Sequence, residues 1–231
     1  MGLDLYAGTF TRYYLGDWQT VVQQSFPGQV TVQRPPNPDR ISDPIQISEI
    51  VAQWMKALST GTGLTLDWDE SLRRPYFTDK PAWDAFGALK IWAAHDDQSL
   101  DASAHDQPIT IENWSKDPSL TPYRDQPGSG RYPYITSDTE IWLPLSEPAL
   151  FTGPDATGNE RMFGEVGMLL AELELLNQRT WNASDEAAEQ WRRDGVEHAS
   201  PLEPAARFGW AVTRCVAAHA VKHRLPLLLD Y

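Results

Sequence analysis

The chain has 231 residues, of which 32 are Asp or Glu and 19 are Lys or Arg, so its formal net charge is −13. An acidic field of this size repels polyanions, which excludes nucleic acids and anionic membrane surfaces as expected partners and favours a basic protein. With 41% hydrophobic residues, 10 Trp, 8 Tyr and 7 Phe, the composition is typical of a globular domain and excludes a disordered chain.

Residues 3–14 are predicted to form the first strand. Its apolar residues alternate, with Leu3, Leu5 and Ala7 on one face and Tyr6 on the other. Further strands are expected at 29–33, at 109–114, as a tightly turned pair within 140–153, and at 226–231.

Six helices are predicted from apolar residues at helical spacing and from capping residues at their starts. They are expected at residues 17–26, 48–58, 81–97, 159–176, 184–195 and 204–223. The first begins at an Asp17 cap and the fourth at an Asn159 cap. A proline-rich connection at 34–44 and a long irregular stretch at 98–138 separate these elements.

The closing "PLLLDY" is nearly all apolar, which predicts a strand covered on both faces inside a sheet. We therefore expect an α+β fold in a single globular domain, 1–231. A mixed β-sheet would contain the N- and C-terminal strands, with about six helices packed on it. Residues 98–138 would be a long irregular acidic insertion rich in Pro, Ser and Gly.

The compartment is expected to be the cytoplasm. Cys215 is the only cysteine, so an intrachain disulfide is excluded. The first residues lack the basic and then apolar pattern of a secretory signal. No apolar run approaches the roughly 20 residues that a membrane span needs.

The densest polar stretch, "HDDQSLDASAHDQ", supplies the candidate binding residues. Its carboxylates and two others in the acidic insertion would dock a basic partner through electrostatic attraction. The predicted binding residues are Asp96, Asp97, Asp101, Asp106, Asp117 and Asp125.

A metal site is the alternative interpretation of the same stretch. His95, Asp96, Asp97 and His105 combine ligand types that suit a divalent transition metal, which can activate water for hydrolysis. Their spacing matches no fixed ligand motif, and the solvated end of a helix explains the same residues. We therefore predict no bound cofactor and keep a metal-dependent hydrolase as the alternative function.

Two weaker candidates remain. Cys215, His219 and His223 share one face of the last helix and resemble part of a zinc set, although no fourth ligand is evident. The stretch "TDKPAWDAFGAL" mixes acids with aromatic rings, as sugar-binding sites do. No Walker A, G-x-G-x-x-G, G-x-S-x-G or C-x-x-C motif is present.

Three stretches together, "MGLDLYAGTFTRYY", "TDKPAWDAFGAL" and "HRLPLLLDY", resemble a group of uncharacterised bacterial proteins with the same beginning, middle and end. The resemblance implies one domain and a bacterial origin, and it supplies no activity. The sequence therefore predicts a non-catalytic protein-binding protein. Its most concrete form is a bacterial immunity (antitoxin-like) protein that neutralises a basic toxin through an acidic surface.

Overall fold

The computed structural model of the chain describes residues 3–26, 28, 43–105 and 107–231. A six-stranded sheet lies at its centre, with the strand order β2-β1-β6-β3-β5-β4. Every neighbouring pair is antiparallel except β3 and β5, which are parallel, so the sheet is mixed. The strands are β1 (Asp4–Ala7), β2 (Phe77–Asp79), β3 (Ile141–Leu143), β4 (Leu150–Pro154), β5 (Glu160–Glu165) and β6 (Leu227–Asp230).

The first and last strands are neighbours, as the sequence predicts. In the register of β1 and β6, Asp4 faces Asp230 and Ala7 faces Leu227. β6 also pairs with β3, so it joins the two halves of the sheet. Leu227 and Leu228 are both buried, which fits the prediction that this strand is covered on both faces.

Nine α-helices are present in the described ranges, where the sequence predicts about six. The three unexpected ones, α1, α5 and α6, have only four to six residues each, too few to show an apolar period. The helices are α1 (Phe10–Leu15), α2 (Val21–Ser25), α3 (Pro44–Thr62), α4 (Trp83–Gln98), α5 (Thr121–Asp125), α6 (Pro133–Thr136), α7 (Val166–Arg179), α8 (Asp185–Asp194) and α9 (Leu202–His223). The α+β class is therefore confirmed.

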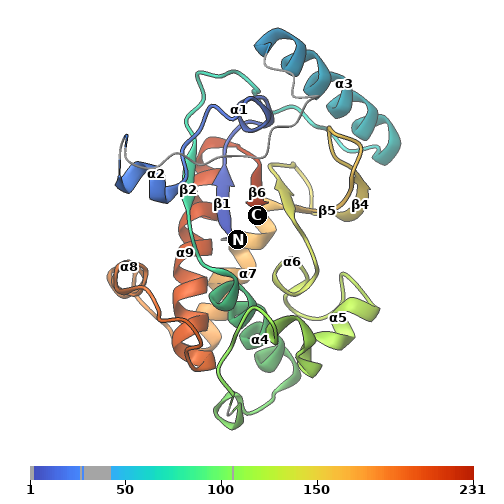
Figure 1. The fold of residues 1–231 in the computed structure, drawn as a ribbon. Coiled ribbons are helices and arrows are strands. Elements are labelled where there is room, and N and C mark those ends of the chain that lie inside the picture. Colours follow the sequence, from blue (N-terminus) through green and yellow to red (C-terminus); the bar gives the residue numbers. More distant parts are fainter. Residues whose placement is uncertain (1–2, 27, 29–42, 106) are drawn as a thin grey trace.

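Each face of the sheet carries its own core. Leu3, which directly precedes β1, and Leu5 and Ala7 of β1 pack into one apolar cluster with α4, α7 and α9. Tyr6, which points to the opposite face, packs with α1 and α3 in the other cluster. Successive side chains of β1 point to opposite faces of the sheet, as expected of a strand, and both faces are packed against helices. In Figure 1, α3 lies over the upper part of the molecule and α4 and α5 over the lower part, with the sheet between them.

Residues 98–138 are part of the fold rather than an appendage. They contain α5, α6 and three short 3₁₀ turns, η1 (Ala102–Ala104), η2 (Trp114–Lys116) and η3 (Pro118–Leu120). Ile109, Leu120 and Tyr123 are buried in a third cluster, against α4 and α9. The strand predicted at 109–114 is wrong, because these residues form turns that lead into η2.

Several predicted boundaries are corrected. The first strand ends at Ala7, because Thr9 accepts a hydrogen bond from the Arg12 amide and caps α1. The two strands within 140–153 do not pair with each other, since β5 lies between them. Asn159 caps no helix; it precedes β5, and Glu165 caps α7.

Other predictions have mixed outcomes. Ser184 caps α8 and α9 ends at His223, so these two helices are confirmed. α2 begins after Thr20 rather than after Asp17, because Thr20 and Gln23 form a capping box. The strand predicted at 29–33 lies outside the described residues, as does nearly all of the 34–44 connection. Among the described helices, none is long and apolar enough to cross a membrane.

Candidate functional site

A half-enclosed cleft of about 230 Å³ opens beside the ends of β3, β5 and β6. α1, which follows β1, brings two tyrosines to it, and the β4–β5 hairpin brings an acid, an amide and an arginine. The polar residues that line it are Tyr13, Tyr14, Glu140, Asp155, Thr157, Asn159, Arg161 and Tyr231. We call this the tyrosine–carboxylate cleft.

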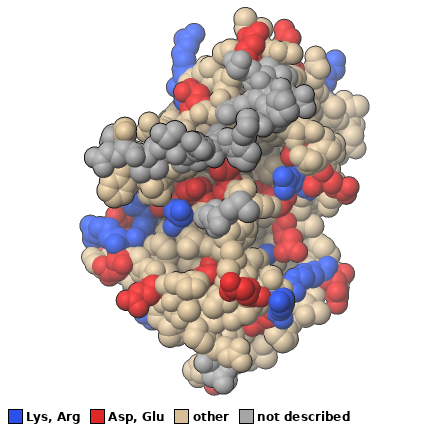
Figure 2. Space-filling model, viewed as in Figure 1, with Lys and Arg blue, Asp and Glu red and all other residues tan. Residues whose placement is uncertain are grey.

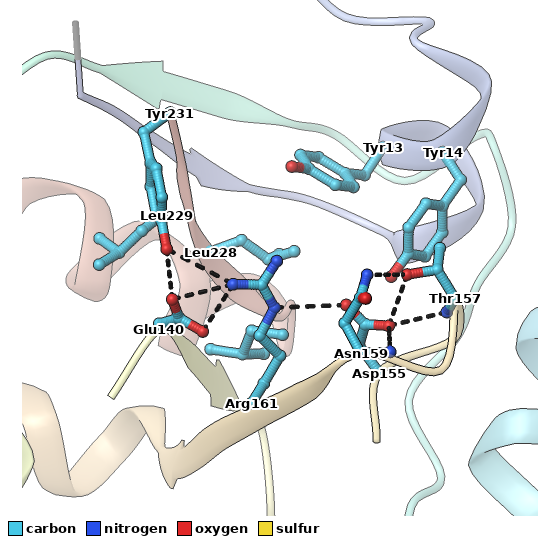
Figure 3. A pocket seen from close by; sticks show the side chains of 11 residues that line it. Tyr13, Tyr14, Glu140, Asp155, Thr157, Asn159, Arg161, Leu228, Leu229 and Tyr231 are labelled. Carbon is cyan, nitrogen blue, oxygen red and sulfur yellow. Dashed lines mark hydrogen bonds and ion pairs between the residues drawn. The ribbon is translucent and has the colours of Figure 1, made fainter. Parts of the chain in front are cut away.

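Arg161 lies at the centre of the cleft. Its Nη1 donates to both carboxylate oxygens of Glu140 at 2.9 Å, and its Nε donates to Asp155 Oδ2 at 3.4 Å. Tyr231 donates its phenolic O–H to Glu140. Figure 3 shows Glu140, Arg161 and Asp155 in a row, with Tyr231 at one end and Tyr14 at the other.

This row forms because strands distant in sequence become neighbours. Glu140 directly precedes β3, and Arg161 lies on β5, which pairs with β3 in parallel. The Glu140 amide donates to Met162 O at 3.1 Å, and its carbonyl accepts from Leu229 N at 3.0 Å. Both backbone groups are therefore fixed by the sheet, which holds the carboxylate beside the guanidinium.

Asp155 is fixed by the tight turn that follows β4. Its Oδ1 accepts hydrogen bonds from Thr157 N at 2.8 Å, Thr157 Oγ1 at 2.7 Å and Asn159 N at 3.0 Å. Gly158 takes the left-handed conformation, with φ at 85°, that this turn requires. Because Oδ1 is used in the turn, Oδ2 is the oxygen that faces Arg161.

Three tyrosines complete the cleft. Tyr13 donates to Asp230 Oδ1 at 2.6 Å, so it links the cleft to a third carboxylate. Burial, and then the nearby Asp155, raise the pKa of Tyr14, and burial and Glu140 raise the pKa of Tyr231. Both phenols therefore remain neutral at physiological pH.

The charge balance of the cleft is negative. Hydrogen bonds to Glu140 raise the pKa of Arg161, so its guanidinium stays charged. Two carboxylates, those of Glu140 and Asp155, pair with this one cation, and a third, that of Asp230, accepts from Tyr13 of the cleft. A cation is therefore the favoured occupant, because it meets the surplus carboxylate charge and the faces of tyrosine rings.

The cleft is also small. Sites for drug-sized ligands enclose roughly 300–1,000 Å³, whereas this cleft has about 230 Å³. A nucleotide or an oligosaccharide exceeds that volume. One long side chain of a protein partner fits it.

The predicted acidic binding residues make hydrogen bonds inside their own chain. Asp96 accepts from Tyr132 and from Arg179 Nε, the latter at 2.8 Å, and Asp97 accepts from the hydroxyl of Tyr123 at 2.8 Å. Arg131 also approaches Asp96, at 3.3 Å. Figure 2 shows acidic and basic side chains interleaved over the lower part of this face rather than one continuous acidic patch.

The remaining predicted acids differ in their surroundings. Asp101 caps η1, and Asp117 caps η3 and also contacts His105. Asp125 is exposed at the end of α5. Asp106 lies outside the described residues.

The four predicted metal ligands are divided between two places. The rings of His95 and His105 lie 6.1 Å apart, whereas Asp96 and Asp97 turn toward tyrosines. No group of three or more His, Cys, Asp or Glu side chains that could hold a metal ion is found within the described ranges. In α9, His219 stacks on Phe77 at 4.9 Å.

The acids of "TDKPAWDAFGAL" make structural contacts. Asp79 accepts from Arg192 at 2.6 Å, and Asp84 lies 2.5 Å from His198. Trp83 stacks on Trp114. Each acid of this stretch therefore has a partner from α8 or from the segment that follows it.

Sequence reasoning missed the cleft. The letters "PDATGN" do signal a turn, since Asp, Gly and Asn favour tight turns. Nothing in the sequence indicates that Glu140 and Arg161 meet. A scan against protein-family models found no match, and searches of curated proteins and of solved structures found none either.

Proposed function

We propose that this is a non-catalytic binding protein that takes a basic segment of a partner protein. Its concrete form is an immunity-type (antitoxin-like) protein of the bacterial cytoplasm that neutralises a basic toxin. A lysine or arginine side chain of the partner enters the tyrosine–carboxylate cleft. The acidic surface that the sequence predicts at 98–138 is then secondary to this cleft.

One observation carries the proposal: a side-chain-sized cleft in which two carboxylates pair with a single guanidinium, and one of its tyrosines donates to a third carboxylate. Such a cleft leaves carboxylate charge for an incoming cation. Charge-assisted hydrogen bonds to carboxylates are roughly twice as strong as neutral ones, and a ring face adds about 0.5–2 kcal/mol. Lys and Arg are the protein side chains with this chemistry.

The charge of the whole chain supports the same partner. A net charge of −13 attracts a basic protein from a distance and raises its encounter rate. The carboxylates of the predicted binding residues contribute to this long-range field even though Asp96 and Asp97 are bonded internally. The field brings the partner close, and the cleft then selects a cationic side chain.

Binding of a lysine-rich peptide tests the cleft directly. The wild-type protein is expected to bind it, and a peptide with every lysine replaced by glutamine is expected not to bind. Glu140→Gln keeps acceptors for Arg161 and Tyr231 but removes one charge, so the affinity should fall about tenfold, which is about 1.4 kcal/mol. Calorimetry measures both affinities.

Asp125→Asn is the matched control, because it removes one exposed acid outside the cleft. It should leave the affinity unchanged. If Asp125→Asn weakens binding while Glu140→Gln does not, the docking surface is the 98–138 segment. If the wild-type protein binds neither peptide, the proposal is wrong.

A further inference from the structure

Lysine and arginine place different demands on the acceptors of the tyrosine–carboxylate cleft. Lysine carries a compact ammonium group with three rotatable donors, whereas arginine carries a planar fork of donors that matches the two oxygens of one carboxylate. The occupancy of the carboxylate oxygens therefore decides which of the two side chains the cleft prefers. An inference drawn from it rests on the proposed function, because it concerns which cation of the partner enters.

Glu140 has little acceptor capacity left. A carboxylate oxygen has about two lone pairs. Oε1 of Glu140 accepts from Arg161 Nη1 at 2.9 Å and from the hydroxyl of Tyr231, so both of its lone pairs are used. Oε2 accepts only from Arg161 Nη1, also at 2.9 Å, and keeps one lone pair. Glu140 therefore offers a single oxygen to an entering cation.

Asp155 also offers a single oxygen. Its Oδ1 accepts the three hydrogen bonds of the turn, from the amides of Thr157 and Asn159 and from the Thr157 hydroxyl. Its Oδ2 has the contact with Arg161 Nε at 3.4 Å, which is longer than an ordinary hydrogen bond. Neither Asp155 nor Glu140 therefore presents two open oxygens, so a guanidinium fork cannot form its paired hydrogen bonds with either carboxylate.

Asn159 supplies a neutral acceptor at the Asp155 end of the cleft. Its Nδ2 donates to Thr157 Oγ1 at 2.8 Å, which fixes the amide group and leaves Oδ1 to accept. Figure 3 shows Asp155, Asn159 and Tyr14 together at this end. Single acceptors on separate side chains suit the three diverging donors of an ammonium group better than they suit a flat fork.

We infer that the partner side chain bound in the cleft is a lysine rather than an arginine. Its ammonium group donates to Asp155 Oδ2 and to Asn159 Oδ1, at the end of the row opposite Tyr231. Glu140 and Arg161 stay paired and form the wall of the site. Asn159 is then a specificity-determining residue, since it accepts from the cation without adding charge.

Two peptides of equal charge test the inference on the wild-type protein. One is the lysine-rich peptide, and the other has arginine in place of every lysine. Equal charge keeps the long-range attraction the same, so the ratio of the two affinities reports the cleft itself. Calorimetry should show that the arginine peptide binds at least about tenfold more weakly, because its forks find no carboxylate with two open oxygens.

Asn159→Ala removes the amide acceptor and keeps the backbone N–H that donates to Asp155. It should weaken binding of the lysine peptide about tenfold and change binding of the arginine peptide much less. Gln53→Ala is the matched control, because it removes an exposed amide side chain on α3. It should change neither affinity.

The outcomes separate this inference from the proposed function. If the wild-type protein binds the two peptides equally, or the arginine peptide more tightly, the inference is overturned and the proposed function stands. If Asn159→Ala binds the lysine peptide as the wild-type protein does, Asn159 has no role in specificity. If the wild-type protein binds neither peptide, both the inference and the proposed function are overturned.

Discussion

Two glutamates each accept hydrogen bonds from the first turn of a helix to which they do not belong. Glu172 of α7 is only 4% exposed, and its Oε2 accepts from Tyr134 N at 2.9 Å and from Ile135 N at 3.0 Å. These are amides of the first turn of α6, and the preceding Tyr132 provides no side-chain cap. Glu172 therefore fills the capping role for α6 from another helix, and Glu70 accepts two further first-turn amides of α1 beside the Thr9 cap.

The ionisation of Glu172 is expected to make stability depend on pH. Burial raises its pKa from 4.5 to about 8. Between these values the folded state binds more protons than the unfolded state, so the contribution of Glu172 is fully present below about pH 4.5 and is lost as the pH rises through about 8. Glu172→Gln keeps an acceptor for both amides and removes the titration.

We expect the free energies of unfolding of wild type and Glu172→Gln to differ more at about pH 8 than at about pH 5. Between these pH values the variant should gain roughly 2–4 kcal/mol of stability relative to wild type. Urea unfolding at the two pH values measures the difference. Glu174→Gln, on the same helix but paired with Arg214 and partly exposed, is the control and should show no such change. Parallel pH curves for wild type and Glu172→Gln would contradict the assignment.

The contact between α4 and α9 depends on a glycine. A Cβ at Gly209 would lie 2.1 Å from the carbonyl oxygen of Ala85, which is backbone and cannot move aside alone. The two helices therefore approach closely at this point. Both of them carry the core on the α4 side of the sheet.

Gly209→Ala should destabilise the protein by roughly 2–4 kcal/mol, because α4 and α9 must separate to admit the methyl group. Gly61→Ala is the matched control: Gly61 is exposed in α3, and a Cβ there meets nothing within 4 Å. That change should stabilise by about 0.5–1 kcal/mol through helix propensity. Thermal melts compare the two, and equal effects would refute the close contact.

The elements that the sequence predicts well are those with a local signal. α8 has a Ser184 cap, and β6 is a continuous apolar run. The short helices were missed because four to six residues show no apolar period, and some of their first-turn amides have remote partners: the Glu70 carboxylate accepts from Phe10 N and Thr11 N at the start of α1. The cleft was missed for the same reason, since its row of charges exists only once β3 and β5 are paired.

At the scale of the whole molecule, charge acts beyond individual contacts. Many carboxylates are paired locally, as Asp96 is with Arg179, yet the chain keeps a net charge of −13. The opposite charges of an ion pair cancel each other's field beyond a short distance. The unpaired negative charge of the chain therefore sets the electrostatic field felt by a distant partner. Electrostatic attraction of a basic partner should therefore depend on ionic strength more than on any one acid.

Association with a basic partner should slow at least about tenfold between low salt and ~0.5 M salt, because screening shortens from about 10 Å at 0.1 M to a few Å. Dissociation should change much less. Pull-down from the native host at both salt levels tests for such a partner, and surface plasmon resonance separates the two rates. An association rate that does not respond to salt, or no partner at either level, would contradict electrostatic steering.

The position of β6 between β1 and β3 has a consequence for synthesis on the ribosome. Until residues 227–230 leave the exit tunnel, the strands form two separate groups. One group is β1 with β2, the other is β3 with β5 and β4, and no strand hydrogen-bonds the two groups together. The sheet can therefore close only after β6 has formed, and this long-range pairing between β1 and β6 is the kind of contact that slows folding.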